Sequence, residues 1–261
     1  MTRIYNCSVE ADYAAGMRMA LSAIGRSALV VIPTDTVYGI AADAFSPGAV
    51  QKLLDAKGRG RTSPPPVLIP SVTTMDALAI DIPQPVRDLV AEFWPGGLTV
   101  ILNAQPSLVW DLGETQGTVA LRMPSNAVAL DVLKQTGPLA VSSANLSGQP
   151  AAMDAAGAEE ALGDRVAVYL DGGVAGAEYG TDAEASVGLA STIIDATGFA
   201  ANGGKLVIVR RGVVSREQIE AVIGDALEPE AAPVPEAAPV PEAAPVSDVM
   251  PEPPAEPTSR D

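Results

Sequence analysis

Four short segments of this 261-residue chain concentrate side chains that could bind a small anionic ligand. They are PTDTVYG at residues 33–39, AKGRGR at 56–61, ALRMP at 120–124 and SSANLSG at 142–148. Hydroxyl, amide and guanidinium groups all donate hydrogen bonds to phosphate or carboxylate oxygens. Each segment alone is also typical of an ordinary turn or strand end. The prediction of a ligand-binding site therefore depends on the four segments occurring together.

The segment AKGRGR concentrates positive charge in an acidic chain. Its cations Lys57, Arg59 and Arg61 follow a helix that Ser46 should cap and that Pro47 should open. Cations suit a helix C terminus for structural reasons alone. The glycines between them favour a flexible cationic loop instead, which suits a polyphosphate better than a helix end.

Uncharged donors follow two predicted strands. Ser143 and Asn145 could bind a phosphate or ribose, and the hydroxyls of Thr34, Thr36 and Tyr38 could bind a small polar ligand. In an open α/β sheet, loops that follow strands line the crevice where ligands bind. These donors are therefore candidates for one common site.

Further polar groups stand at predicted strand ends. Arg122, in ALRMP, has a guanidinium group that could bind a carboxylate through two parallel hydrogen bonds. Ser191–Thr192 and Arg210–Arg211 repeat the pattern of a polar group at a strand terminus.

The absence of histidine excludes several kinds of catalytic site. With no histidine and one cysteine, the chain cannot form a Ser-His-Asp triad, a Cys-His pair or a histidine-based zinc site. Cys7 is expected to be an incidental thiol, which fits a reducing compartment. The formal charge of −16 argues against extended nucleic-acid binding by bulk charge, while a local basic pocket stays open.

The elements that must position these groups follow an α/β pattern. β-Branched runs alternate with helical stretches over residues 1–226, which predicts one α/β domain. Ser125 and a Ser215/Gln218 capping box should each open a helix. Other helices are expected at 12–24, 47–56 and 85–92, and strands at 28–33, within 64–70, and at 98–102, 119–123, 138–143, 166–170, 191–195 and 205–209.

The C-terminal region has a different composition. Residues 227–261 contain three PEAAPV repeats and are predicted to form a disordered, acidic Pro/Ala/Glu-rich tail, because such a sequence cannot bury apolar surface. No segment reaches the roughly 20 apolar residues that span a bilayer, and the N terminus lacks an apolar signal-peptide core. The expected location is the cytoplasm, with no membrane partner.

In order and together, the motifs resemble the YrdC-domain threonylcarbamoyl-AMP synthases. The resemblance covers about residues 9–223 and is carried by IPTDTVYGIAADA, AKGRGR, FWPGGLTVIL, TVALRMP and AVSSANLSG. The family's catalytic signature, a Lys-x-Arg followed by a Ser-x-Asn, is present as Lys57/Arg59 and Ser143/Asn145.

The resemblance implies a YrdC-like α/β fold, with a twisted, mostly mixed sheet and flanking helices around a deep concave cavity. It implies an L-threonylcarbamoyladenylate synthase, a nucleotidyltransferase that makes threonylcarbamoyl-AMP and pyrophosphate from L-threonine, bicarbonate and ATP for tRNA modification. Threonine would contact Thr34, Arg122 and Ser191. ATP would contact Lys57, Arg59, Thr118, Ser143, Asn145 and Arg210.

The same resemblance implies the cofactor and partners. Mg²⁺ would accompany ATP, although no carboxylate cluster identifies a protein metal site. The unstable adenylate would pass to a separate tRNA threonylcarbamoyl transferase, and direct contact with tRNA or double-stranded RNA stays open.

Three departures from the family pattern matter. Family members commonly carry a histidine after the Lys-x-Arg, in a Pro-Leu-x-x-His context, where this chain has PPPVLIPS. One threonine contact must therefore be made differently or lost. The segment 172–190 is longer than usual and places Ala190 before the Ser-Thr pair. An acidic tail stands where long members carry a second domain, so the chain resembles the short form.

Two other functions stay open from sequence. One is a non-catalytic RNA-binding module on the same fold, against which the intact signature argues. The other is a different carbamoyl transfer, as in hydrogenase-maturation proteins, whose zinc-binding cysteines this chain lacks. Neither a Walker A motif nor a GxGxxG after a strand is present.

Overall fold

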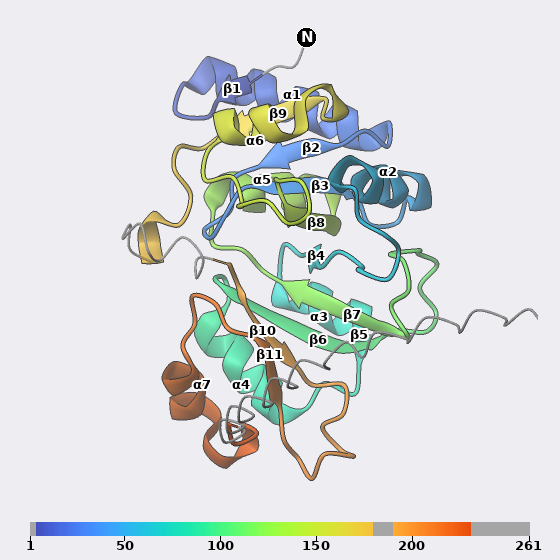
Figure 1. Ribbon diagram of the computed structural model, residues 1–261, viewed down its shortest axis with the longest axis vertical. Coiled ribbons are helices and arrows are strands. Elements are labelled where there is room, and N and C mark those ends of the chain that lie inside the picture. The colour runs from blue at the N-terminus through green and yellow to red at the C-terminus, as the bar shows by residue number, and fades with distance from the viewer. Residues whose placement is uncertain (1–3, 180–189, 231–261) are drawn as a thin grey trace, which may run out of the picture. The chain divides into compact units, whose positions relative to one another are not determined.

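A mixed β-sheet runs through the computed structural model, which describes residues 4–179 and 190–230 (Figure 1). Its strands are β1 (Ile4–Asn6), β2 (Val30–Ile32), β3 (Gly39–Asp43), β4 (Val67–Leu68), β5 (Ala79–Ile80), β6 (Leu98–Ala104), β7 (Thr118–Arg122), β8 (Leu139–Ser143), β9 (Val168–Asp171), β10 (Thr192–Asp195) and β11 (Val207–Arg210). The strand order is β1-β9-β2-β3-β8-β4-β7-β6-β10-β11, and β5 pairs with β6.

Both kinds of strand pairing occur in this sheet. The pairs β1/β9, β2/β9, β4/β7 and β6/β10 are parallel. The pairs β2/β3, β3/β8, β4/β8, β5/β6, β6/β7 and β10/β11 are antiparallel. The predicted mixed α/β sheet is confirmed.

Seven α-helices flank the sheet in the described part of the chain. They are α1 (Glu10–Gly25), α2 (Pro47–Lys57), α3 (Val72–Leu78), α4 (Gln84–Phe93), α5 (Ala127–Thr136), α6 (Ala155–Leu162) and α7 (Arg216–Ile223). These elements belong to the unit Met1–Glu228. The predicted disordered tail falls mainly on residues 231–261, outside the described residues. Among the described helices, none is both long and apolar enough to cross a bilayer.

Helix starts follow local capping chemistry. The Ser46 side chain accepts a hydrogen bond from the Ala49 backbone N–H at the start of α2, and the Ser215/Gln218 capping box opens α7, as predicted. The prediction that Ser125 caps the next helix is wrong. Asn126 caps α5, because its Oδ1 accepts from the Ala129 N–H at 3.2 Å.

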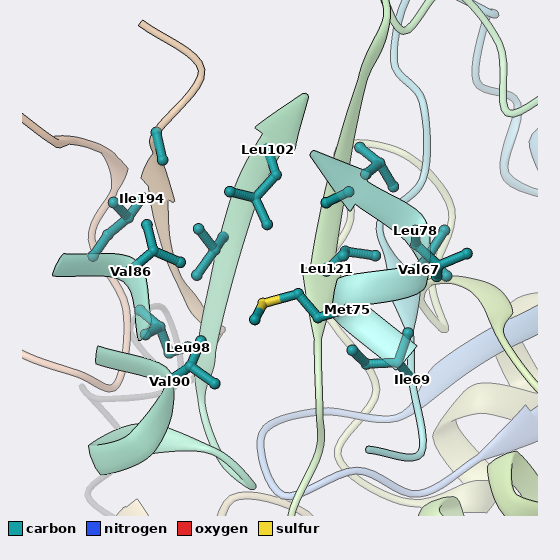
Figure 2. Close-up of a cluster of buried hydrophobic side chains, with 14 of the residues drawn as sticks. Val67, Ile69, Met75, Leu78, Val86, Val90, Leu98, Leu102, Leu121 and Ile194 are labelled. Carbon is teal, nitrogen blue, oxygen red and sulfur yellow. The ribbon is translucent and has the colours of Figure 1, made fainter. Parts of the chain in front are cut away.

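The core beside the sheet fixes the strands that carry the site. Figure 2 shows Met75 of α3 pointing between Leu98 of β6 and Leu121 of β7. Met75 is fully buried, and burial of such a side chain stabilises the fold by about 2 kcal/mol. The positions of β6 and β7 are therefore set by packing on the side chains of α3 and α4.

Several elements were not predicted from sequence. Strand β3 reads GIAAD, and glycine and alanine are poor strand formers. The pairing of β3 with β2 on one side and β8 on the other compensates for this low propensity. Strands β1 and β5 and helices α3 and α6 are likewise short elements whose sequences carry no clear periodicity.

Candidate active site

A cavity of about 300 Å³ is lined by residues of several strands and of the loops that follow them. Alternate residues Pro64, Pro66 and Leu68 form an apolar wall, as expected when one face of an extended segment is turned inward. The polar lining residues are Thr34, Thr36, Arg59, Thr99, Arg122, Ser142, Ser143, Ser191 and Arg210. No carboxylate is among the described residues that line it, so three arginines make the cavity a site for anions.

The cavity gathers most of the residues predicted from sequence. Six of them line it: Thr34, Arg59, Arg122, Ser143, Ser191 and Arg210. Lys57 and Asn145 do not line the cavity but are hydrogen-bonded to Ser143, whose backbone oxygen accepts from Lys57 Nζ and from the Asn145 N–H. The predicted deep concave cavity is therefore present, and its two signature motifs meet at one wall.

Lys57 is buried and its side chain is hydrogen-bonded to the loop after β8. Its side chain is 1% exposed, and Nζ donates to the backbone oxygens of Ser143 and Asn145, the latter at 2.7 Å. Nζ also lies 3.4 Å from Asn145 Oδ1. The Lys57 backbone oxygen in turn accepts from the Ser147 N–H at 3.1 Å. The Lys-x-Arg and Ser-x-Asn motifs are thus held together by hydrogen bonds.

The end of α2 directs Arg59 into the cavity. Gly58 has φ +63°, a left-handed conformation that glycine adopts without steric cost, and it ends the helix. The Arg59 backbone N–H closes the turn on Leu54 O at 2.9 Å. Its guanidinium reaches Ser142 Oγ at 3.4 Å. Two residues after the buried lysine, the chain therefore presents a cation to the cavity.

The electrostatics of Lys57 follow from its surroundings. Burial, and then the positive charge of Arg59, lower the pKa of Lys57 to about 8. Its hydrogen-bond partners are uncharged oxygens, so no carboxylate offsets the ammonium. This end of the cavity keeps net positive charge.

Arg122 lines the same cavity but has different partners. It donates from Nε to Gly96 O at 2.9 Å, from Nη1 to Thr36 Oγ1 at 2.8 Å and from Nη2 to Asp35 Oδ2 at 2.7 Å. Both members of the Arg122–Asp35 ion pair are buried. A guanidinium has five N–H groups, and these bonds use three. One N–H on each terminal nitrogen is left, among the described contacts, for a ligand.

Asp35 is the centre of a buried network that sequence reasoning missed. Besides Arg122, its carboxylate accepts from the Ser125 N–H at 3.0 Å and from the Tyr179 hydroxyl at 3.0 Å. Asp35 lies inside the PTDTVYG motif, whose hydroxyl groups alone are predicted from sequence to bind a ligand. Its partners are 87 to 144 residues away in sequence, and no local pattern reveals them.

Ser191 and Arg210 form a second polar wall. Arg210 donates from Nε and Nη2 to Ser191 O at 3.0 and 2.8 Å, and from Nη2 to Ser191 Oγ at 2.8 Å. Ser191 Oγ also lies 2.8 Å from Thr99 Oγ1. Desolvation, and then the charges of Arg122 and Arg59, lower the pKa of Arg210, and all three arginines line the cavity.

Thr34 organises the loop between β2 and β3. Its Oγ1 donates to Val37 O at 2.6 Å and lies 3.2 Å from the N–H groups of Thr36 and Val37. This local bonding folds the loop around a buried hydroxyl that still lines the cavity.

Thr118, like Lys57 and Asn145, is a predicted site residue that does not line the cavity. It is the first residue of β7, whereas Arg122 is the last, and about 13 Å of strand separates them. Its hydroxyl donates to Thr115 O at 2.7 Å. Contact of Thr118 with ATP therefore stays a prediction.

The described residues contain no cluster of three or more His, Cys, Asp or Glu side chains that could bind a metal ion. The donors of the cavity are hydroxyls and cations, which do not suit a resident divalent cation. A metal ion at this site would arrive bound to the phosphates of a nucleotide.

Comparison with known sequences agrees with this geometry. A family model for Sua5, YciO and YrdC, described as "Telomere recombination", matches residues 22–212. A Mycobacterium tuberculosis protein, provisionally named threonylcarbamoyl-AMP synthase, is 46% identical over 224 residues, covering 86% of this chain and 96% of that protein. The threonylcarbamoyl-AMP synthase of Bacillus subtilis is 36% identical over 208 residues, 78% of this chain and 56% of that protein.

Solved structures show the same fold. Sua5 of Pyrococcus abyssi in complex with L-threonine superposes with a TM-score of 0.74 at 31% identity, covering 87% of this chain and 62% of that one. YciO of Escherichia coli superposes with a TM-score of 0.68 at 19% identity, covering 84% of this chain and 100% of that one, which shows the fold alone.

Proposed function

The chain belongs to the Sua5/YciO/YrdC family, and from this premise we propose that it is an L-threonylcarbamoyladenylate synthase. The enzyme would form threonylcarbamoyl-AMP and pyrophosphate from L-threonine, bicarbonate and ATP, for threonylcarbamoyl modification of tRNA. It is a nucleotidyltransferase by reaction class.

One observation carries this proposal. A single cavity combines three arginines with uncharged hydroxyl donors and, among its described lining residues, no carboxylate. The reaction joins a carbamate anion to a polyanionic nucleotide, so its main barrier is the approach of like charges. A cavity with fixed positive charge lowers that barrier without a histidine or another strong base.

The reaction has two parts. The threonine amine and bicarbonate give a carbamate with loss of water. A carbamate oxygen then forms a bond to the α-phosphorus of ATP, while the bond from that phosphorus to the bridging oxygen breaks and its electron pair leaves with pyrophosphate. The carbamate is already anionic, so the protein needs to position the reactants and stabilise charge more than to remove a proton.

Arg59, Arg210 and Ser143 would serve the nucleotide. Arg59 and Arg210 face the cavity and would bind phosphate oxygens, and Ser143 would donate near the α-phosphate. Lys57 and Asn145 would contribute from behind: Lys57 contacts the Ser143 and Asn145 carbonyls, and the Asn145 amide donates to Leu146 O and Gln149 O at 2.9 and 2.6 Å. The loop that presents Ser143 would thereby be rigid before ATP binds.

Arg122, Thr34 and Ser191 would serve threonine. The two remaining N–H groups of Arg122 would bind the amino-acid carboxylate, and Thr34 and Ser191 would contact its polar groups. The wall formed by Pro64, Pro66 and Leu68 offers no polar side chain, and the histidine that relatives commonly have near the position of Pro70 is missing from this chain.

The remaining partners follow from the reaction. Mg²⁺ would enter with ATP as part of the substrate and screen its phosphates. The adenylate product is unstable, so a separate tRNA threonylcarbamoyl transferase would consume it. The single cysteine fits the reducing cytoplasm.

The proposal is tested by pyrophosphate release from purified protein with ATP, Mg²⁺ and bicarbonate. We expect release that requires L-threonine and that falls to background when threonine is replaced by other amino acids or omitted. An RNA-binding module would release no pyrophosphate under any of these conditions, and that result would refute the proposal.

A further inference from the structure

We propose that Tyr179 is a positioning residue for threonine: its hydroxyl orients the buried Asp35 carboxylate, which in turn orients Arg122 in the cavity. The inference rests on the proposed function, since it concerns the threonine end of that same site. Tyr179 itself is outside the cavity lining.

The contacts form a direct chain. The Tyr179 hydroxyl donates to Asp35 Oδ2 at 3.0 Å, and the same oxygen accepts from Arg122 Nη2 at 2.7 Å. The side chain of Asp35 is fully buried and that of Arg122 is 7% exposed. One carboxylate oxygen thus joins a tyrosine from a distant segment to the guanidinium that faces the ligand.

Tyr179 must act as a donor for this chain to exist. Burial, and then the negative charge of Asp35, raise the pKa of Tyr179 above its ordinary value. The hydroxyl therefore stays protonated at neutral pH. A buried carboxylate that shares one oxygen between a guanidinium and a phenol has little freedom to rotate.

The absence of a side chain at Gly97 leaves room for the Tyr179 hydroxyl. A Cβ at Gly97 would lie 3.0 Å from the Tyr179 hydroxyl oxygen and 2.1 Å from Val213 Cγ2. The neighbouring Gly96 supplies the carbonyl that accepts from Arg122 Nε. The FWPGGLTVIL motif thus supplies both an Arg122 contact and the space that Tyr179 needs.

A second hydrogen bond joins the turn that carries Tyr179 to Ser125. Ser125 donates from Oγ to Glu178 Oε2 at 3.2 Å, while its backbone N–H binds Asp35 Oδ1. The turn Ala177–Tyr179 is therefore attached on both sides of the Asp35 carboxylate. It belongs to the segment 172–190, whose length departs from the usual family pattern.

The decisive variant is Tyr179→Phe, which removes one oxygen and keeps the ring. Steady-state pyrophosphate release would be measured while threonine is varied at saturating ATP, and then while ATP is varied at saturating threonine. We expect the KM for threonine to rise about fivefold, as for the loss of one hydrogen bond, with the KM for ATP within about twofold of wild type. Calorimetric titration with L-threonine should show a matching loss of affinity.

Tyr13→Phe is the matched control. Tyr13 also donates to a carboxylate, Asp131 Oδ2, at 2.7 Å, but between α1 and α5, away from the cavity lining. It should leave both KM values unchanged. In an Asp35→Asn background, Tyr179→Phe should add no further increase in the KM for threonine, because its route of action is already removed.

Each other outcome overturns the inference. Unchanged kinetics in Tyr179→Phe, an equal rise in both KM values, or a lower melting temperature with an unchanged KM for threonine would show a structural role only. An additive effect in the Asp35→Asn background would show that Tyr179 does not act through Asp35. Wild-type protein without threonine-dependent release would instead refute the proposed function itself.

Discussion

Two parts of the site, named here the nucleotide end and the threonine end after their proposed ligands, stabilise a buried cation in opposite ways. At the nucleotide end, formed by Lys57, Arg59 and Ser143, the buried ammonium contacts uncharged oxygens and its charge is not offset. At the threonine end, formed by Asp35, Arg122 and Tyr179, a carboxylate neutralises the buried guanidinium.

The difference matches the charges of the two proposed substrates. ATP is a polyanion, so an uncompensated positive charge favours its binding. Threonine is a zwitterion with no net charge, so a neutral pair with fixed hydrogen-bond directions recognises its carboxylate without attracting other anions. Charge would therefore select the nucleotide and geometry would select the amino acid.

The largest effect is expected from removing the positive charge that faces the cavity at the nucleotide end. Arg59→Ala should lower threonine-dependent pyrophosphate release by at least about 100-fold, because a positioned donor to the reacting phosphates is lost. The fold should be intact by circular dichroism. Arg61→Ala removes the same charge from the same loop, but its side chain is 44% exposed and pairs with Asp111, so it should retain most activity. Near-normal turnover of Arg59→Ala would contradict the assignment.

The next largest effect is a difference between the two ends in the stability lost when the charge of one buried residue is removed. Asp35→Asn should lower the free energy of unfolding by about 3 kcal/mol, because it leaves the Arg122 charge buried without its counter-ion. Lys57→Met removes a charge that is already desolvated, so its loss of stability should be smaller. Chemical denaturation of both variants measures the difference. A larger loss for Lys57→Met would mean that its ammonium is better compensated than the contacts indicate.

A third prediction uses the titration of Lys57. Its pKa of about 8 lies below the ordinary value of 10.5, so the folded chain releases this proton first. The affinity for a non-hydrolysable ATP analogue should fall as pH rises through about 8, since charge at the nucleotide end is lost. Over the window from about 8 to 10.5, the contribution of Lys57 to stability should rise, because the unfolded state binds more protons there.

Threonine affinity provides the internal control for that pH profile. The protein groups at the threonine end do not include Lys57, so wild-type and Lys57→Met proteins should show the same pH dependence of threonine binding. A nucleotide profile that is unchanged in Lys57→Met would assign the titration to another group.

The smallest effect is expected at the loop that contacts Arg61, two residues after Arg59. Asp111 Oδ1 accepts from Arg61 Nη2 at 2.6 Å and from the Gly113 N–H at 3.1 Å, and Arg61 lowers the pKa of Asp111. This ion pair is exposed, so Asp111→Asn should raise the KM for ATP by only about twofold and leave the KM for threonine unchanged. A change confined to threonine would contradict this placement.

The sequence predicted those parts of the site that depend on local signals. Ser46 and Pro47 located the start of α2, and the glycines after Lys57 indicated the cationic loop. The order of the motifs predicted that Arg59, Arg122 and Ser143 belong to one site, and all three residues line the cavity. These features arise within a few residues of chain, where capping and turn chemistry decide the conformation.

The parts that could not be predicted depend on distant contacts. The burial of Lys57 against the Ser143 carbonyl joins residues 86 apart, and the sequence does not indicate that its ammonium turns away from the cavity. Tyr179 lies in a segment without regular periodicity, and its bond to Asp35 spans 144 residues. Strand β3, with its alanines, forms only because β2 and β8 supply partners.

A crystal structure with L-threonine and a non-hydrolysable ATP analogue bound together would test the account most directly. We predict both ligands in the one cavity, with the α-phosphate within hydrogen-bond distance of Ser143 and the threonine carboxylate on the free N–H groups of Arg122. Binding of either ligand outside the cavity, or with the two ends exchanged, would contradict it.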